Sequence, residues 1–485
     1  MSSTLSELKP SHLWKHFERL LSIPHCSGCE KPLAEDVGAF AKKLRLEFKK
    51  DKTGNVLVRK PGTAGRETAE VVTLQGHMDM VCEKNSDVRH DFSKDPIEAV
   101  IHDGWVRAKG TTLGSDNGIG VAAALAIMED TSLVHGPLEF LFTVDEETGL
   151  TGARRIEPGF LKGKKLINLD SEDEGTFTIG CSGGADSEIV FPLKRKAARL
   201  KAGLRVKIAG LRGGHSGLDI SQGRANAIKL LVRMLTHAET RIPFELISVN
   251  GGNKHNAIPR EAWADLAIDP KAIEAFKSHL KEAFTDAKAE FGSVEKEMSS
   301  SVEPLKPGKK QPMTAAGQKT FLRFLSVCPH GVVRMHPEIP NLVETSTNLA
   351  IVRTAAAKAT VICSSRSSIG PALEAVRESI KALADLSEAR AKQPEGYPGW
   401  EPDLKSGLLR KLKDIHVKVF GSEPHVVAVH AGLECGIIGE KFPGMEMISF
   451  GPTIKHPHSP EEGVEIASVE KFWTFLTAVL TGLAE

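Results

Sequence analysis

The sequence lacks features that mark several classes of protein. Its 63 Lys and Arg residues are balanced by 62 Asp and Glu residues, so we expect no electrostatic capture of nucleic acid or of an anionic membrane. Residues 1–9 lack the apolar segment of a secretory signal. We also find no uninterrupted apolar run long enough to span a bilayer. These absences favour a cytoplasmic enzyme.

Cysteine is also scarce. Seven cysteines in 485 residues, an odd number, do not predict a disulfide framework. Cys26 and Cys29 form a CxxC motif after His25, but a zinc site would need a second pair of ligands nearby, and a redox site would need a thioredoxin-like context. The sequence shows neither. We interpret the motif as part of a loop between two helices, with a redox pair as the alternative.

The order of helices and strands predicts an α/β protein with an inserted domain. The length exceeds one ordinary core, and 41% hydrophobic with 26% charged residues is typical of a soluble globular protein. Apolar strands alternate with helices, such as 11–21 and 31–47, over residues 1–188 and again over 400–485. We assign both segments to one discontinuous domain with a mixed sheet flanked by helices. Residues 189–399 predict an α+β domain of two similar halves, joined by a connector at 306–312.

Histidine and acidic side chains recur where the expected strands of the discontinuous domain end. His77 and Asp79 follow the apolar run 71–74. Residues two apart in extended chain point to the same side, so the carboxylate can orient the ring. The other residues in comparable places are Asp116, Glu146, Glu147, Asp170, His456 and His458. Side chains gathered at strand ends are what an open α/β sheet offers as a binding site.

Each position also has a simpler interpretation. A lone His-x-Asp is common, Asp116 can be a helix N-cap, and Glu146 and Glu147 can belong to a solvated acidic turn. Together, however, these residues offer imidazole and carboxylate ligands without a thiolate, which suits Zn²⁺, Mn²⁺ or Co²⁺. Five ligands fit two metal ions that share a bridging carboxylate, while another carboxylate acts as general base.

The sequence contains eight characteristic segments, GHMDMV, GTTLGSDNGIGVA, TVDEETGLTGA, NLDSEDEG, GLRGGHSG, NAIPREA, HAGLECG and GPTIKHPHSPEE. They resemble the aminoacyl-histidine dipeptidase family, the Xaa-His (beta-Ala-His) branch of the aminoacylase/carboxypeptidase-type di-zinc metallopeptidases. They occur in the family's order and cover nearly the whole chain. The resemblance implies a two-domain di-zinc exopeptidase fold, in which the inserted domain acts as a lid and commonly forms a homodimer.

The resemblance also implies a role for each matching residue of the discontinuous domain. The implied metal ligands are His77 and Asp170 for one ion, Glu147 and His458 for the other, and Asp116 as the bridge. Asp79 would orient the His77 ring, and Glu146 would be the general base. A cis peptide bond is implied between Asp116 and Asn117, and His456 would be a bystander.

Four further residues match substrate-contacting groups of the family, three in the inserted domain and one, Glu434, in the segment 400–485. His215 would hydrogen-bond the developing oxyanion. Asn256 and Arg366 would bind the substrate, with Arg366 on its C-terminal carboxylate, although a surface arginine is the simpler interpretation. Glu434 would lie near the substrate amine.

We therefore expect a metal-dependent dipeptidase that hydrolyses Xaa-His and related dipeptides with two divalent ions, most plausibly Zn²⁺. The alternatives within the superfamily are a tripeptidase, an aminoacylase and a carboxypeptidase. A non-catalytic binding protein with an inactive site is the alternative from another class, but every expected ligand and the base are present.

Overall fold

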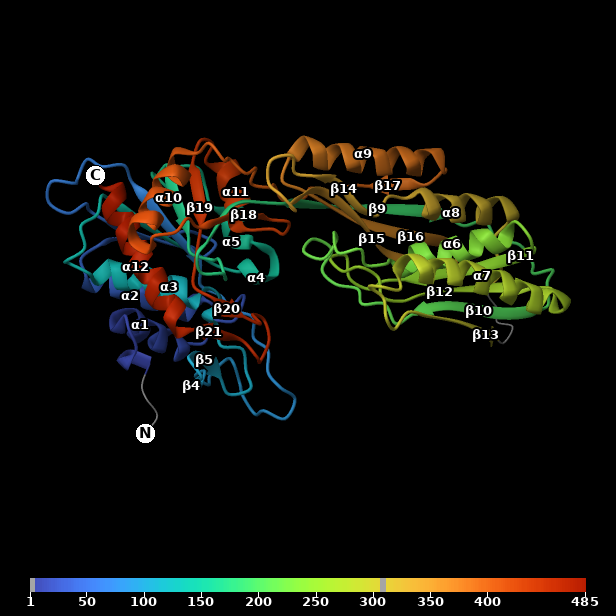
Figure 1. Cartoon of the computed structure of the whole chain (residues 1–485), viewed down its shortest axis with the longest axis horizontal. Coiled ribbons are helices and arrows are strands. Elements are labelled where there is room, and N and C mark those ends of the chain that lie inside the picture. The colour runs from blue at the N-terminus through green and yellow to red at the C-terminus, as the bar shows by residue number, and fades with distance from the viewer. Residues whose placement is uncertain (1–4, 306–310) are drawn as a thin grey trace. The chain divides into compact units, whose positions relative to one another are not determined.

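The computed structural model describes residues 5–305 and 311–485 (Figure 1). The expected connector at 306–312 therefore lies largely outside the described residues. The chain forms two compact units. The first contains the described residues up to Cys181 together with Trp400–Ala428 and Leu433–Glu485, and the second contains Ser182–Gly399 and Val429–Gly432. We expected a boundary at residue 188, which lies inside strand β9 (Gly183–Pro192), and this strand belongs as a whole to the second unit.

A mixed eight-stranded sheet forms the centre of the first unit, as predicted. Its strand order is β1-β2-β6-β3-β7-β19-β8-β18. The strands are β1 Glu47–Lys50, β2 Val56–Lys60, β3 Val72–His77, β6 Leu138–Thr143, β7 Lys165–Asn168, β8 Thr176–Cys181, β18 His425–Val429 and β19 Glu446–Ser449. Strand β3 pairs in parallel with β6 and β7, so their carboxyl ends meet at one edge. All residues of β3 and β6 are buried, including polar ones such as Gln75 and Glu139, which explains why neither strand shows the alternation of a half-exposed strand.

Helices pack around this sheet. The main ones are α1 Ser11–Leu21, α2 Lys31–Lys43, α3 Ser115–Glu129, α10 Gly407–Phe420 and α12 Ile466–Leu483. The helix expected over 31–47 ends at Lys43, because Arg45 has a positive φ and β1 begins at Glu47. Helix α3 is buried along most of its length, and its small side chains let it lie close to β3.

Helix α12 is long and apolar, although Glu470 and Lys471 interrupt its apolar run. Within the described residues, it is one helix that is long and apolar enough to cross a membrane, by length and composition only. Its residues Phe472, Leu476 and Val479 are nevertheless buried in the hydrophobic core of the first unit.

A small four-stranded sheet joins distant parts of the first unit. Its order is β20-β21-β5-β4, with β4 Ala99–His102, β5 Trp105–Ala108, β20 Ile454–Lys455 and β21 Gly463–Glu465. The pairing of β21 with β5 places the C-terminal segment beside the chain that leads into α3. Asp116 and His458 lie on these two segments.

The second unit is an α+β fold, as expected. Its sheet has the order β13-β10-β12-β11-β15-β16-β9-β17, and β14 (Gly331–Met335) pairs with β15. Besides β9, the strands are β10 Ala202–Ala209, β11 Phe244–Gly251, β12 Ala262–Ile268, β13 Ser299–Leu305, β15 Val343–Thr354, β16 Lys358–Ser367 and β17 Arg390–Lys392. Its main helices, α6 Ala227–Glu239, α7 Ile273–Phe291, α8 Ala315–Val327 and α9 Gly370–Leu386, run along the sheet in Figure 1.

Candidate metal centre

Three expected ligands meet at the carboxyl edge of β3 and β7. His77 ends β3, Asp116 lies at the start of α3, and Asp170 follows β7. His77 Nε2 lies 3.2 Å from Asp116 Oδ1 and 3.3 Å from Asp170 Oδ1. One ligand atom from each residue lies within 4.8 Å of the others, close enough for all three to hold one ion.

A second group of ligands shares Asp116 with the first. His458 Nε2 lies 3.2 Å from Asp116 Oδ2 and 3.0 Å from Glu147 Oε2. The two oxygens of Asp116 thus face two different histidines. One carboxylate thus belongs to both groups of possible ligands. The expected cis peptide bond between Asp116 and Asn117 is confirmed.

The carboxylates in this region affect the protonation of both histidines. Burial opposes protonation of His77, but the carboxylates of Asp170 and Asp116 raise its pKa well above the usual value. Hydrogen bonds to Asp116 and Glu147 raise the pKa of His458 to about 11. The carboxylates therefore favour positive charge at this place, which divalent cations would supply. Glu147 Oε1 is buried without a hydrogen-bond partner among the described residues, so it is free to bind a cation.

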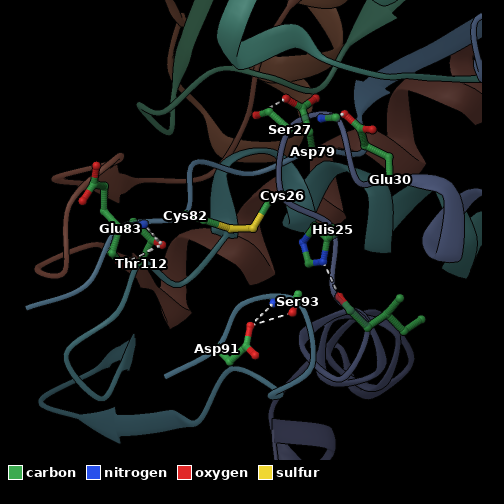
Figure 2. Close-up of a disulfide and its surroundings, with 12 residues drawn as sticks. His25, Cys26, Ser27, Glu30, Asp79, Cys82, Glu83, Asp91, Ser93 and Thr112 are labelled. Carbon is green, nitrogen blue, oxygen red and sulfur yellow. Dashed lines mark hydrogen bonds between the residues drawn. A yellow bond between two sulfur atoms is a disulfide. The ribbon is translucent and has the colours of Figure 1, made fainter. Parts of the chain in front are cut away.

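Asp79 holds the neighbouring groups in place. It accepts hydrogen bonds from the backbone N–H of Glu146 (3.0 Å) and of Glu147 (3.2 Å). It also accepts one from Ser27 Oγ (2.8 Å), which Figure 2 shows. Burial alone would raise the pKa of Asp79, but these bonds and His77 lower it to about 2. The His77 ring is oriented mainly by the backbone carbonyl of Asp79, 2.9 Å from Nδ1, since the carboxylate is 3.6 Å away. Nδ1 is then the donor, and Nε2 faces the other ligands.

Glu146 begins the short helix α4 (Glu146–Gly149) and lies near His77 and Glu147. Burial raises its pKa well above the usual value, and the charges of Asp170, Glu434 and Glu147 add to this effect. A carboxyl group with a raised pKa can both accept and return a proton near neutral pH.

Glu434 begins α11 (Glu434–Lys441) and is 1% exposed. Its Oε2 accepts hydrogen bonds from Gln75 Nε2 (2.6 Å) and Thr143 Oγ1 (2.7 Å). Its Oε1 has no partner among the residues that the structure describes. Burial raises its pKa to about 7. An unpartnered buried oxygen of this kind is suited to receive a donor from a ligand.

Two of the predicted residues of the second unit lie together. Arg366 Nη2 is 3.4 Å from His215 Nε2, and Arg366 Nη1 donates to the Tyr397 hydroxyl (2.8 Å). Arg366 is 7% exposed, so the simpler interpretation of it as a surface arginine is wrong. Burial and the Arg366 charge lower the pKa of His215 to about 4, which leaves the ring neutral at pH 7.

Asn256 lies on an exposed loop beside these residues. Its backbone carbonyl accepts a hydrogen bond from Ser216 N (2.8 Å), and the adjacent Ala257 forms a β-bridge with His215. The loop therefore adjoins His215 through its backbone.

Comparison with known families matches residues 73–482 to one described as Peptidase family M20/M25/M40. The chain belongs to this family. Over 481 residues it is 41% identical to the cytosol non-specific dipeptidase of Escherichia coli (strain K12), a match that covers 99% of each chain. The structure of aminoacylhistidine dipeptidase from Vibrio alginolyticus matches with 41% identity and a TM-score of 0.91, over 99% of this chain and 98% of that one.

A more distant match shows the same fold. The aminopeptidase PepT from Bacillus cereus has a TM-score of 0.57 at 15% identity, over 99% of this chain and all of that one. The predicted resemblance, the two-domain α/β fold class and the assignment to peptide hydrolases are confirmed by membership of the M20/M25/M40 peptidases.

This M20/M25/M40 peptidase contains a disulfide that we did not predict. Cys26 is bonded to Cys82, 56 residues away, while Cys29 is free and exposed. The interpretation of Cys26 and Cys29 as residues of an interhelical loop is correct, and the bond of Cys26 to Cys82 means that Cys26 and Cys29 are not paired with each other. The bond fastens the loop that carries Ser27 to the segment after β3, next to Asp79 (Figure 2). Local spacing could not identify Cys82 as the partner of Cys26, because the two residues are 56 positions apart.

Two further supporting residues of the peptidase were missed. Ser27 binds Asp79, and Glu462 binds the backbone before Asp116. Glu462 stands inside the segment GPTIKHPHSPEE, so the resemblance covered it, but no spacing rule distinguishes it from its exposed neighbour Glu461.

Proposed function

We propose that the protein is a dipeptidase that uses two divalent metal ions to hydrolyse Xaa-His and related dipeptides. The observation that carries the proposal is the position of Asp116, whose two oxygens lie 3.2 Å from His77 Nε2 and 3.2 Å from His458 Nε2. The names of the 41%-identical relatives, both dipeptidases, support the substrate class.

The donor set fits the metals. His77, Asp170 and Asp116 would hold one ion, and Asp116, Glu147 and His458 the other, with Zn²⁺ favoured and Co²⁺ or Mn²⁺ also compatible. When bound, the ions polarise the scissile carbonyl and acidify the attacking water.

Glu146 is the proposed general base. It removes the proton from the attacking water and later returns it to the leaving amine, two tasks that suit a carboxyl group with a raised pKa. Asp79 fixes the backbone of Glu146 and thereby the place from which its side chain acts.

The second unit supplies the proposed oxyanion donor, His215. Its Nδ1 accepts hydrogen bonds from Gly217 N (3.2 Å) and Leu218 N (3.1 Å), so its proton resides on Nε2. Nε2–H and the Arg366 guanidinium approach each other as two donors, an arrangement that calls for an anionic acceptor. The oxyanion would bind His215, and the substrate carboxylate would bind Arg366 with help from Asn256.

Glu434 is proposed to bind the substrate's terminal ammonium group. Its unpartnered Oε1 supports this role, since an ammonium group would supply the missing donors. Recognition of the free amine would disfavour substrates with a blocked N-terminus.

We further propose a cytoplasmic homodimer. The name of the Escherichia coli relative supports the location. For the dimer, the supporting feature is strand β14 in the second unit, which pairs with β15 and exposes Val332, Val333 and Met335. An exposed apolar strand is a suitable surface for pairing with a second copy.

A peptide panel tests the proposed function. Metal-stripped protein, with Zn²⁺, Co²⁺ or Mn²⁺ added back, is assayed on carnosine, Gly-His, Ala-Ala, Ala-Ala-Ala and an N-acetyl amino acid. We expect metal-dependent cleavage of the dipeptides only. Cleavage restricted to the tripeptide or the blocked amino acid would contradict the dipeptidase proposal, and inactivity with every metal would contradict catalysis.

A further inference from the structure

We propose that Glu462 is a positioning residue that fixes Asp116 relative to His458 and so sets the affinity of one metal ion in particular. The inference rests on the proposed two-metal function. Glu462 is not a predicted ligand, and its carboxylate binds the backbone before Asp116 and not the side chains that would hold the ions.

The Glu462 carboxylate is bound on both oxygens. Oε2 accepts hydrogen bonds from Leu113 N (2.7 Å) and Gly114 N (3.0 Å). Oε1 accepts them from Ser115 N (2.7 Å) and Ser115 Oγ (2.6 Å), and Asp116 N lies 3.4 Å away. Successive N–H groups of one loop therefore converge on one carboxylate, and Gly114 allows the turn with a φ of 74°.

This carboxylate is buried without a cationic partner. Glu462 is 2% exposed, and no Lys, Arg or His among the described residues forms an ion pair with it. A buried charge costs several kcal/mol unless it is well solvated by protein groups. Backbone dipoles supply that solvation here, so the loop and the carboxylate stabilise one another.

Glu462 links two segments that are far apart in sequence. It lies four residues after His458, and β21 begins directly after it at Gly463. Its partners are the residues immediately before Asp116 and the backbone of Asp116 itself. His458 Nε2 contacts Asp116 Oδ2, although the two residues are 342 positions apart in the chain. Glu462 belongs to the segment of His458 and binds the segment of Asp116, so it holds this contact together.

The two metal positions should depend on Glu462 unequally. Both positions share Asp116, but one takes its other two ligands, His77 and Asp170, from the ends of β3 and β7, which Glu462 does not touch. The other needs Asp116 and His458 together, and both lie on segments joined by Glu462. Loss of the carboxylate should therefore weaken the ion held by Asp116, Glu147 and His458 more than its neighbour.

The test is a two-site zinc titration of the full-length protein carrying Glu462→Gln. The amide keeps the shape of the Glu462 side chain, but its own N–H groups then face the backbone N–H groups of residues 113–115. We expect the Kd of the ion held by Asp116, Glu147 and His458 to rise about 10–100-fold, while the other Kd stays within about 3-fold. With excess Zn²⁺, kcat should recover and KM should stay unchanged. Glu461→Gln, at the exposed neighbouring position, is the matched control and should alter neither ion.

The possible results separate the two proposals. Two unchanged Kd values in Glu462→Gln, or equal weakening of both ions, would overturn the positioning role and leave the two-metal function intact. Fewer than two ions in the wild-type protein would overturn the two-metal function and this inference with it. Should Glu462→Gln fail to fold, Ser115→Ala removes the hydroxyl donor to Oε1 and leaves the backbone donors in place. Selective weakening of the same ion is then the expected result.

Discussion

Glu146 and Glu147 are neighbours in sequence, but they meet different surroundings. Both backbone N–H groups bind Asp79, yet Glu147 Oε2 lies 3.0 Å from His458 whereas burial and nearby carboxylates raise the pKa of Glu146. The Glu147 carboxylate is thus suited to bind a cation, and the Glu146 carboxylate is suited to carry a proton.

We predict that Glu146→Gln retains two metal ions and lowers kcat by about 10²–10⁴-fold, because the amide cannot accept the proton of the attacking water. Metal content by mass spectrometry and dipeptide turnover check this. Glu147→Gln is the comparison and should lose metal instead. Near-normal turnover in Glu146→Gln would disprove the general-base role.

A pH effect should arise from Glu434. Burial raises its pKa to about 7, and only the ionised carboxylate attracts an ammonium group, so KM for Gly-His should fall as pH rises from 6 to 8. Glu434→Gln should remove this step and raise KM by about 10-fold or more, the loss of a charged hydrogen bond. Glu440→Gln, on the exposed side of the same helix, should retain the wild-type profile. An unchanged pH profile of KM in Glu434→Gln would contradict the assignment.

The sequence predicts the proposed metal ligands better than the residues that hold them in position. The proposed ligands His77, Glu147 and Asp170 lie at or just after the ends of apolar strands, so topology brings them together, whereas Asp116 lies at the start of α3. Ser27 and Glu462 act through hydrogen bonds to segments 52 and 347 residues away, and no local pattern encodes such contacts.

Among the elements, α3 shows how side-chain size controls the position of Asp170, a proposed metal ligand. A Cβ on Gly120 would lie 2.9 Å from Leu169 Cβ and 2.9 Å from the Leu169 carbonyl oxygen. Leu169 immediately precedes Asp170, so the absence of a side chain at Gly120 lets the helix approach the strand end that carries this ligand.

We predict that Gly120→Ala lowers the free energy of unfolding by about 1–3 kcal/mol, the usual cost of overpacking, and weakens metal binding because the Leu169 backbone must shift. Chemical denaturation and metal titration measure the two effects. Gly370→Ala is the control, since a Cβ there meets nothing within 4 Å. Equal stability of the two variants would show that α3 can move without cost.

Element type was predictable, but boundaries and neighbours were less so. The apolar runs at 71–74, 138–144 and 165–169 indicated β3, β6 and β7 because these strands are buried on both faces. The helix over 31–47 was extended too far, since apolar spacing continues past Lys43 although the backbone turns at Arg45. The position of β19 between β7 and β8 depends on tertiary pairing and has no local signal.

At the scale of the whole molecule, the Cys26–Cys82 bond closes a loop that contains most of the N-terminal part of the first unit, from α2 through β3. Closing a loop of this size restricts the unfolded chain more than the folded one.

We predict that Cys82→Ser lowers the free energy of unfolding by about 2–4 kcal/mol under oxidising conditions, and that a reductant lowers the wild type to the same level. Denaturation with and without dithiothreitol measures this. Cys29→Ser, which removes the free thiol of the same loop, should behave like the wild type. A wild type that is insensitive to reductant would mean that the bond contributes nothing to stability.

The place of β19 in the sheet has a consequence for biosynthesis. Strands β7 and β8 emerge from the ribosome early, but the strand that lies between them is made only after the entire second unit. At about 5–20 residues per second, the two strands wait tens of seconds with unpaired edges, during which a nascent chain is open to wrong pairing with its neighbours on the polysome. His458 is made later still. A chain whose synthesis stops before β19 therefore has an open sheet and lacks one of the proposed metal ligands. Such a chain is a substrate for chaperones and proteases and not a partly active peptidase.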